Sequence, residues 1–169
     1  MFIGEGPGFH ENEQGRPFVG AAGQFLEELL ASIGMKREQV FITNVVKCRP
    51  PGNRDPQIEE LEACSGYLDR QIQAINPKVI VTLGRFSMAR FLPNARISQV
   101  HGQLMRVRGR TIVPMYHPAA ALHQPSLRGL IEKDFSQLPE WMVKAETVQE
   151  VEPISQKTET QNPEQLNLF

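Results

Sequence analysis

The stretch Lys78-Val79-Ile80-Val81-Thr82-Leu83-Gly84 decides the fold. Its apolar, β-branched run predicts a strand, and Gly84 ends that strand. Apolar clusters of this kind alternate along the chain with amphipathic stretches, which is the pattern of an α/β domain. The sequence therefore predicts a three-layer α/β/α domain with a short, mainly parallel central sheet.

Two further strands are expected before this one, at Met1–Ile3 and at Val40–Val46. Apolar residues at helical spacing indicate a helix over Val19–Ile33, which Gly34 can close. The other expected elements are a helix that starts at Asp55-Pro56 with Ile58, Leu61, Leu68, Ile72 and Ile75 on its apolar face, a short helix near Phe86–Phe91, a hairpin over Gln103–Pro114 with its turn at Arg108-Gly109, and a last helix over Ser126–Val143.

Length and composition restrict the class of protein. The chain has 169 residues, of which 40% are hydrophobic and 22% charged, as expected for one globular domain. No apolar run approaches the roughly 20 residues of a membrane helix, and the first residues lack a signal pattern, so a cytoplasmic protein is expected. Beyond Val143, two lysines and five glutamates carry −3 of a total formal charge of −1, so residues 1–143 carry +2. That bias alone does not indicate nucleic-acid binding.

Unusual residues follow the expected strands. The turn Gly4-Glu5-Gly6-Pro7-Gly8 comes after the first strand, Asn44 ends the second, Gly84 follows the third, and His117-Pro118 follows the hairpin. Because ligands gather at the carboxyl ends of parallel strands, we expect these groups to converge on one edge of the sheet. The glycine turn matches neither the dinucleotide fingerprint nor a phosphate-binding P-loop.

Each of these residues also has an ordinary structural interpretation. Phe18, held between Pro17 and Val19-Gly20, can be a core residue. Asn44 can be a turn residue whose amide is satisfied by its neighbours. His117 is held extended by the following proline, and a lone histidine is more often structural than catalytic. Only their combination points to a shared site.

Four ordered motifs give that combination: Gly4-Glu-Gly-Pro-Gly8, Gly15-Arg-Pro-Phe-Val-Gly20, Thr43-Asn-Val-Val-Lys-Cys-Arg-Pro-Pro51 and His117-Pro-Ala-Ala-Ala-Leu122. Together they resemble the motifs of family 4 uracil-DNA glycosylases, the iron–sulfur branch of that superfamily, over residues 1 to about 143. The resemblance implies hydrolysis of the N-glycosidic bond of uracil in DNA, which leaves an abasic site for base excision repair. It also implies a monomer in the bacterial cytoplasm, associated with the nucleoid.

The resemblance also assigns roles at the site. Phe18 would stack on a flipped uracil, and Asn44 would read its Watson–Crick edge, accepting from N3–H and donating to O4. Cytosine presents the opposite pattern and would leave both groups unsatisfied. His117 would donate to O2, where negative charge develops, and Glu5 or Glu11 would stabilise the cationic sugar or position water. The implied catalytic residues are Glu5, Asn44 and His117, and the implied base-binding residues are Gly4, Gly6, Phe18, Asn44 and His117.

Contacts to DNA are expected around the same edge. The loop after His117 would enter the duplex, with Leu122 replacing the extruded base and His123 standing where relatives often carry arginine. Arg49 and Arg54 are candidate phosphate contacts, together with Lys47 and Arg128. A solvated basic surface is the alternative for these side chains.

Cys48 and Cys64 are the only cysteines. In the resembled family four cysteines hold a [4Fe–4S] cluster, two of them spaced like this pair, and the other two form a Cys-x-x-Cys pair ahead of the glycine turn. That pair is absent here, and two thiolates cannot complete the site. We expect either an N-terminally truncated sequence or a variant without the cluster; two reduced thiols are the alternative.

The end of the chain carries a separate signal. Residues 144–164 are polar and acidic, which predicts a disordered linker. The terminal Gln165-Leu166-Asn167-Leu168-Phe169 resembles the bacterial sliding-clamp-binding motif, in which Gln165 anchors the peptide and Leu166, Leu168 and Phe169 supply its apolar groups. The expected organisation is thus a catalytic domain over 1–143, the linker, and a clamp-binding peptide over 165–169.

Two other functions compete with hydrolysis. One is a uracil-DNA-binding relative that traps its product covalently or does not turn over. Such relatives carry a basic, histidine-containing insertion after the second-strand motif, whereas Pro50–Asp55 is short and has no histidine. The other is a nucleotide-binding α/β enzyme, which would leave Asn44 and His117 without a purpose. Both comparisons favour the hydrolase.

Overall fold

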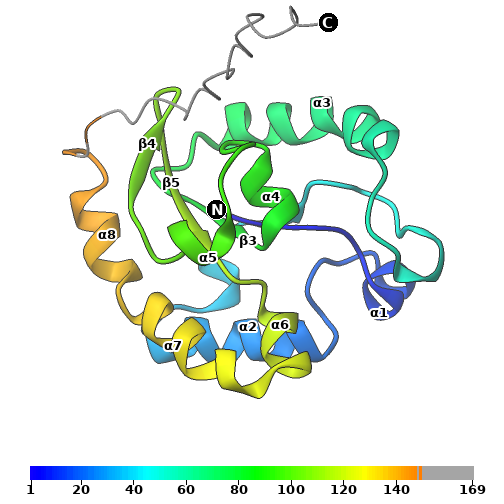
Figure 1. The fold of residues 1–169 in the computed structure, drawn as a ribbon, viewed down its shortest axis with the longest axis horizontal. Coiled ribbons are helices and arrows are strands. Elements are labelled where there is room, and N and C mark those ends of the chain that lie inside the picture. Colours follow the sequence, from blue (N-terminus) through cyan, green and yellow to red (C-terminus); the bar gives the residue numbers. More distant parts are fainter. Residues whose placement is uncertain (148, 150–169) are drawn as a thin grey trace, which may run out of the picture.

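The computed structural model describes residues 1–147 and residue 149 and contains a five-stranded sheet. The sheet order is β2-β1-β3-β5-β4 (Figure 1). Strands β1 to β3 and β5 run parallel, and β4 pairs antiparallel with β5, so the predicted short, mainly parallel sheet is confirmed. The strands are β1 Phe2–Gly4, β2 Ile42–Asn44, β3 Ile80–Leu83, β4 Met105–Val107 and β5 Arg110–Met115.

Helices cover both faces of this sheet, as the three-layer prediction requires. They are α1 Phe9–Gln14, α2 Ala21–Ser32, α3 Ile58–Ile75, α4 Arg85–Ala89, α5 Ile97–Val100, α6 Pro118–His123, α7 Arg128–Ser136 and α8 Leu138–Lys144, with short 3-10 helices at Arg37–Gln39, Pro51–Asn53 and Pro125–Leu127. Within the described part of the chain, none of these helices has the length and apolar character needed to cross a membrane.

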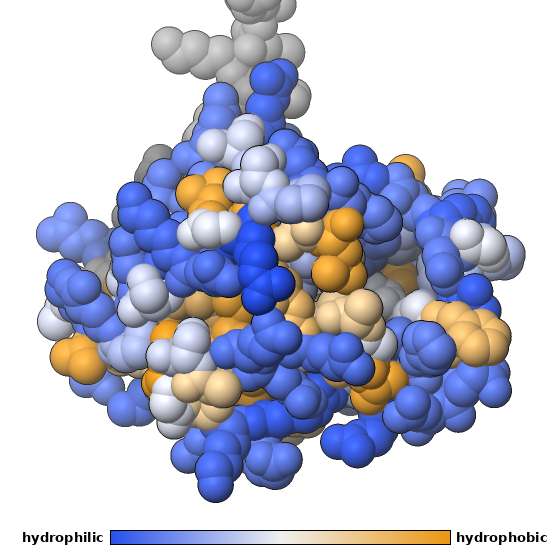
Figure 2. All heavy atoms as spheres, turned by 90° about the horizontal axis from the view of Figure 1, so that it is seen from below, coloured by the Kyte–Doolittle hydropathy of each residue, from blue (hydrophilic) through white to orange (hydrophobic). Residues whose placement is uncertain are grey.

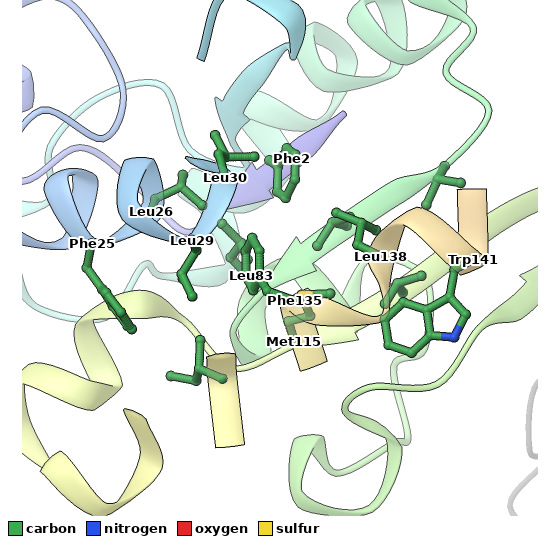
Figure 3. Close-up of a cluster of buried hydrophobic side chains, with 14 of the residues drawn as sticks. Phe2, Phe25, Leu26, Leu29, Leu30, Leu83, Met115, Phe135, Leu138 and Trp141 are labelled. Carbon is green, nitrogen blue, oxygen red and sulfur yellow. The ribbon is translucent and has the colours of Figure 1, made fainter. Parts of the chain in front are cut away.

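The alternating side chains of the strands separate two cores. Phe2, Val81 and Val113 face α2, α7 and α8, and the rings of Phe2 and Phe135 stack with their centroids 6.0 Å apart. Figure 3 shows this core, in which leucines of α2 meet Leu83, Phe135 and Leu138. On the opposite face Ile3, Ile80 and Ile112 pack against α3 and α4. Successive residues of each strand thus face opposite cores, as expected for a sheet that is buried on both sides.

Two predicted helix boundaries are wrong. Helix α3 begins at Ile58 rather than at Asp55-Pro56, because Gln57 is its N-cap and Glu60 accepts from the Gln57 backbone N–H at 2.8 Å. Ile58 is consequently 70% exposed and does not belong to the apolar face. The last helix is not continuous over Ser126–Val143: it is divided into Pro125–Leu127, α7 and α8, with Pro139 in the first turn of α8.

The predicted hairpin is confirmed, and so is the predicted end of α2 near Gly34. Arg108 and Gly109 both have positive φ, at 50° and 71°, and form the turn between β4 and β5.

The folded domain reaches slightly beyond Val143, since Ala145 is buried and its carbonyl accepts from the Thr111 hydroxyl at 3.1 Å. Residue 148 and residues 150–169, which include most of the predicted linker and the whole predicted clamp-binding peptide, lie outside the described residues.

Candidate active site

The carboxyl ends of β1 and β2 bring together the first site residues. Gly4 and Asn44 are partners in the strand register, and each ends its strand. A Cβ atom on Gly4 would lie 2.5 Å from Asn44 Oδ1 and 2.6 Å from the Phe18 ring, so only glycine lets these two side chains approach the backbone. Gly6 is equally confined, because its Cβ would lie 2.6 Å from the side chain of Val46.

The Asn44 side chain is buried, and its Oδ1 atom accepts no hydrogen bond from the described residues. The residue is 5% exposed. A buried carbonyl oxygen without a donor is unfavourable by roughly 1–3 kcal/mol. Such an atom is expected at a site where a ligand supplies the missing donor.

Phe18 is held in a strained conformation by its surroundings. Its φ of 55° is rare for a bulky residue, and the ring is buried at 5% exposure. The Arg37 guanidinium donates to the Phe18 carbonyl at 2.7 Å and also to the Pro17 carbonyl. Gly23 of α2 lies against the same peptide, where an added Cβ would be 2.1 Å from the Phe18 carbonyl carbon. No local pattern in the sequence indicates this role for Arg37, which stands 19 residues from Phe18.

Glu11 holds the other side of the Phe18 loop. Its Oε1 accepts from the backbone N–H groups of Val19 at 2.9 Å and Gly20 at 2.8 Å. Burial alone would raise the pKa of this carboxyl, but these backbone hydrogen bonds hold the pKa below its ordinary value. Glu11 therefore stays ionised and, together with Arg37, fixes the loop on both sides of Phe18.

His117 is positioned as the N-cap of α6. Its Nδ1 accepts from the Ala119 N–H at 3.1 Å, and its ring stacks against Phe18 with centroids 5.2 Å apart. Burial lowers the pKa of His117 to about 4, against a smaller opposing effect of Glu11. The imidazole is therefore neutral at pH 7, and because Nδ1 is an acceptor, Nε2 carries the proton and is a donor. Gly84 makes room for it, with its Cβ position 3.2 Å from His117 Cβ.

Glu5 stands in the turn after β1 and is half-buried. The Val46 N–H donates to its backbone carbonyl at 3.0 Å, which ties the turn to the loop after β2. Burial and then the nearby Asp55 carboxylate raise the pKa of Glu5, and Arg85 lowers it. Arg85 also forms an ion pair with Asp55, so Glu5 lies beside a carboxylate whose charge is partly compensated.

Two adjoining cavities open between these groups. One, of about 230 Å³, is lined by Glu5, Phe18 and His117 among others. The other, of about 420 Å³, is lined by Asn44. Pro7 and Glu11 line both cavities, so the two cavities adjoin at the glycine turn. The structure thus brings Glu5, Gly6, Phe18 and His117 to one cavity and places Asn44 in the lining of the adjoining one.

The predicted DNA contacts differ in their partners. Arg54 forms two hydrogen bonds with Glu60, at 2.7 and 2.8 Å, whereas Arg49 donates to the Asn53 side chain at 2.7 Å. Leu122 and His123 are exposed on α6, Leu122 by 48%. The two other basic candidates are engaged as well: Lys47 donates to Thr43, Asn44 and Gln71, and Arg128 pairs with Glu28 and Glu132.

The two cysteines lie near each other but form no complete metal site. The Lys47 N–H donates to Cys64 Sγ at 3.3 Å, which places the α3 thiol beside the residue that precedes Cys48. Cys48 is exposed and Cys64 is half-buried, and both are free thiols. Across residues 1–147 and 149, no group of three or more His, Cys, Asp or Glu side chains could hold a metal ion. The residues present therefore do not fit a four-thiolate cluster.

Comparisons with known proteins agree with this geometry. Residues 1–141 match the family model described as "Uracil DNA glycosylase superfamily". A type-4 uracil-DNA glycosylase of Sulfurisphaera tokodaii is 50% identical, with 83% of this chain and 68% of that protein covered. The type-4 enzyme of Archaeoglobus fulgidus is 51% identical, covering 83% and 75%, and that of Thermotoga maritima is 43% identical, covering 85% and 78%. The chain therefore belongs to the uracil-DNA glycosylase superfamily.

Proposed function

We propose that this protein excises uracil from DNA by hydrolysing the N-glycosidic bond, which leaves an abasic site for base excision repair. The observation that carries the proposal is the buried Asn44 Oδ1, which lacks a donor among the described residues. The N3–H of uracil is a donor of the required kind. The names of the type-4 relatives support the same substrate.

Discrimination against cytosine follows from the Asn44 carboxamide. Its oxygen accepts from uracil N3–H, and its NH₂ group donates to O4. Cytosine offers an acceptor at N3 and a donor at position 4, so both pairs would be mismatched, each costing on the order of 1–3 kcal/mol. The burial of Asn44 prevents water from compensating the mismatch.

Phe18 and His117 act on the extruded base. The fixed Phe18 ring offers a stacking surface that offsets part of the loss of base stacking in the duplex. As the glycosidic bond breaks, negative charge develops at uracil O2, and His117 Nε2–H donates to it, with backbone N–H groups of the Gly4–Gly6 turn beside it. A neutral donor fixed in advance stabilises this charge without reorganisation.

Glu5 acts on the sugar side of the bond. An ionised carboxylate there stabilises the positive charge of the departing sugar and orients the attacking water. One water is consumed: its oxygen and one of its protons form the hydroxyl group on C1′, and its other proton neutralises the uracil anion that leaves as the C1′–N1 bond breaks. Glu11 is assigned to holding the Phe18 loop, since its Oε1 already accepts two backbone hydrogen bonds.

On the DNA side, we assign Leu122 as the wedge that fills the place of the extruded base, with His123 beside it. Arg49 and Arg54 are assigned to the phosphates, although Arg54 would have to share or leave Glu60. We further propose that the protein acts as a monomer near the bacterial nucleoid.

Cys48 and Cys64 are proposed to be two of four thiolate ligands of a [4Fe–4S] cluster. Because they are the only cysteines among the 169 residues, the other two thiolates would have to come from a polypeptide segment that these residues do not include. Such a cluster would supply structural cross-linking of the loop after β2 to α3. No step of the reaction described above depends on it.

The last residues are proposed to bind the bacterial sliding clamp, with Gln165 as anchor and Leu166, Leu168 and Phe169 as apolar groups. Tethering would raise the local concentration of the enzyme at newly made DNA. Deletion of Gln165–Phe169 should abolish clamp binding in a pull-down with purified clamp while excision from short oligonucleotides is unchanged. Loss of both activities would show that the tail is structural.

The test of the proposed function is single-turnover cleavage of matched oligonucleotides that carry one uracil, cytosine or thymine. Alkali then reveals abasic sites. Strand cleavage is expected for the uracil oligonucleotide alone. If the protein binds the uracil oligonucleotide but releases no uracil, the proposed hydrolysis is wrong and the function is uracil-DNA binding without turnover.

A further inference from the structure

An exposed aromatic residue stands at the edge of the site. Phe9 is 54% exposed and opens α1, a helix that has no buried residue. Its ring makes an edge contact with His10, with centroids 5.4 Å apart. Burial in the domain core therefore does not account for an aromatic side chain at this position.

A guanidinium group lies over the same ring. Arg49 Cζ is 5.3 Å from the Phe9 centroid, and Arg49 Nε donates to the Asn53 side chain. Within the described part of the chain, no carboxylate pairs with Arg49, unlike Arg54, which is neutralised by Glu60. The pair therefore presents a flat aromatic surface and a positive charge that is available to an anion.

This pair stands next to residues that line the 230 Å³ cavity. Gly8, directly before Phe9, lines the cavity, and so does Pro50, directly after Arg49. Ala119 of α6, the helix that carries Leu122, also lines this cavity. Figure 2 shows one face of the molecule, on which apolar side chains stand among hydrophilic ones.

We infer that Phe9 and Arg49 bind the nucleotide next to the extruded uracil, with its base stacked on Phe9 and its phosphate held by Arg49. This inference rests on the proposed function and deepens it by assigning a contact to the flanking DNA. A strand whose base has entered the cavity must pass over the rim. An exposed aromatic beside a cation is the combination that holds single-stranded nucleic acid without reading its sequence.

The test uses fluorescence anisotropy to measure how tightly the protein binds a single-stranded oligonucleotide that contains 2′-fluoro-deoxyuridine. The glycosidic bond of this nucleotide resists cleavage. In two further oligonucleotides an abasic spacer replaces the base on the 5′ or the 3′ side of the uridine. Phe9→Ala should weaken binding of the intact oligonucleotide about tenfold. One of the two spacers should weaken wild-type binding by a similar factor and leave Phe9→Ala unaffected, and Phe9→Trp should restore wild-type behaviour.

Tyr67→Ala is the matched control. Tyr67 is 57% exposed on α3, and Arg70 Cζ lies 4.8 Å from its ring centroid, but neither residue lines the cavities at the site. The affinity of Tyr67→Ala for the oligonucleotides should equal that of wild type. The melting temperature of Phe9→Ala should also equal that of wild type, because α1 has no buried residue.

Three results would overturn the inference. Unchanged affinity in Phe9→Ala would remove Phe9 from the DNA contact. An equal loss for all three oligonucleotides would show that no flanking base stacks on Phe9. If wild type excises no uracil and does not prefer uridine-containing DNA, the proposed function fails, and the inference fails with it; the first two results leave uracil excision intact.

Discussion

The two sides of the site cavity are built differently. On the inner side Phe18 and Asn44 are buried and His117 is half-buried, and Arg37, Glu11 and the glycines of the strand ends fix their positions. On the rim Phe9 and Leu122 are exposed and Arg49 is half-buried, and these side chains have few partners. The inner side is suited to reading the chemistry of one base, whereas the rim is suited to holding DNA of any sequence. Substitutions should therefore affect the chemical step on the inner side and affinity on the rim.

The largest effect is expected from His117→Ala. Loss of the Nε2–H donor should lower the single-turnover rate of uracil release by about 10² to 10³-fold, because charge at O2 is no longer stabilised. Affinity for uncleavable uracil DNA should change only a few-fold. A loss of affinity as large as the loss of rate would remove the distinction between the inner side and the rim.

The pH dependence of stability tests the burial of the same residue. The folded pKa of His117 is lowered from 6.5 to about 4, so the unfolded chain binds its proton at higher pH than the folded chain does. The stability contribution of the neutral imidazole is full above pH 6.5 and is lost as pH falls toward 4, by about 3 kcal/mol. Urea unfolding at pH 7 and 4.5 should show a larger loss for wild type than for His117→Ala; equal losses would contradict the burial.

Asn44→Leu should separate recognition from stability. Uracil release should slow by about 10 to 100-fold, because the pairing with N3–H and O4 is lost. The free energy of unfolding should be equal or higher, since the buried Oδ1 has no partner to lose. Thermal unfolding provides the second measurement, and strong destabilisation would show that Asn44 is chiefly structural.

Arg37→Met should have a smaller effect on the rate, about tenfold, through the loss of order at Phe18. Most of this effect should lie in kcat, with KM little changed, because the loop positions the extruded base after DNA has bound. The control is Glu27→Gln, which removes only the 3.4 Å ion pair of Arg37 and should match wild type. Equal effects in both variants would place the function of Arg37 in that ion pair.

The smallest effect is expected on the rim. Leu122→Ala should slow excision a few-fold in duplex DNA and not in single-stranded DNA, since only a duplex has a gap to be filled after extrusion. Rates on the two substrates in parallel give the comparison. Equal slowing on both would exclude a wedge function for Leu122.

The convergence of the site residues could be predicted because it follows from sheet geometry. Gly4 and Asn44 each end a strand, His117 comes just after β5, and parallel strands end at one edge. The positive φ of Arg108 and Gly109 followed equally from local chemistry, since a tight hairpin turn demands it. Such features depend on a few consecutive residues, and sequence alone contains them.

The remaining features depend on contacts between distant residues. The start of α3 was misplaced because Asp55 pairs with Arg85 of α4 instead of capping the helix. The roles of Arg37 and Glu11 at the Phe18 loop depend on the packing of α1 and α2, which no local pattern specifies. The sequence therefore indicates the residues of the site, whereas the residues that hold them in place are identified only by the structure.

The most direct test of the central claim replaces one hydrogen atom of the substrate. Single-turnover release is measured from two identical oligonucleotides, one with deoxyuridine and the other with 3-methyl-deoxyuridine, which has no N3–H. If Asn44 Oδ1 accepts from N3–H, uracil should be released at least about a hundredfold faster than 3-methyluracil. Equal rates of release would contradict the account, because the buried oxygen would then have no part in recognising the base.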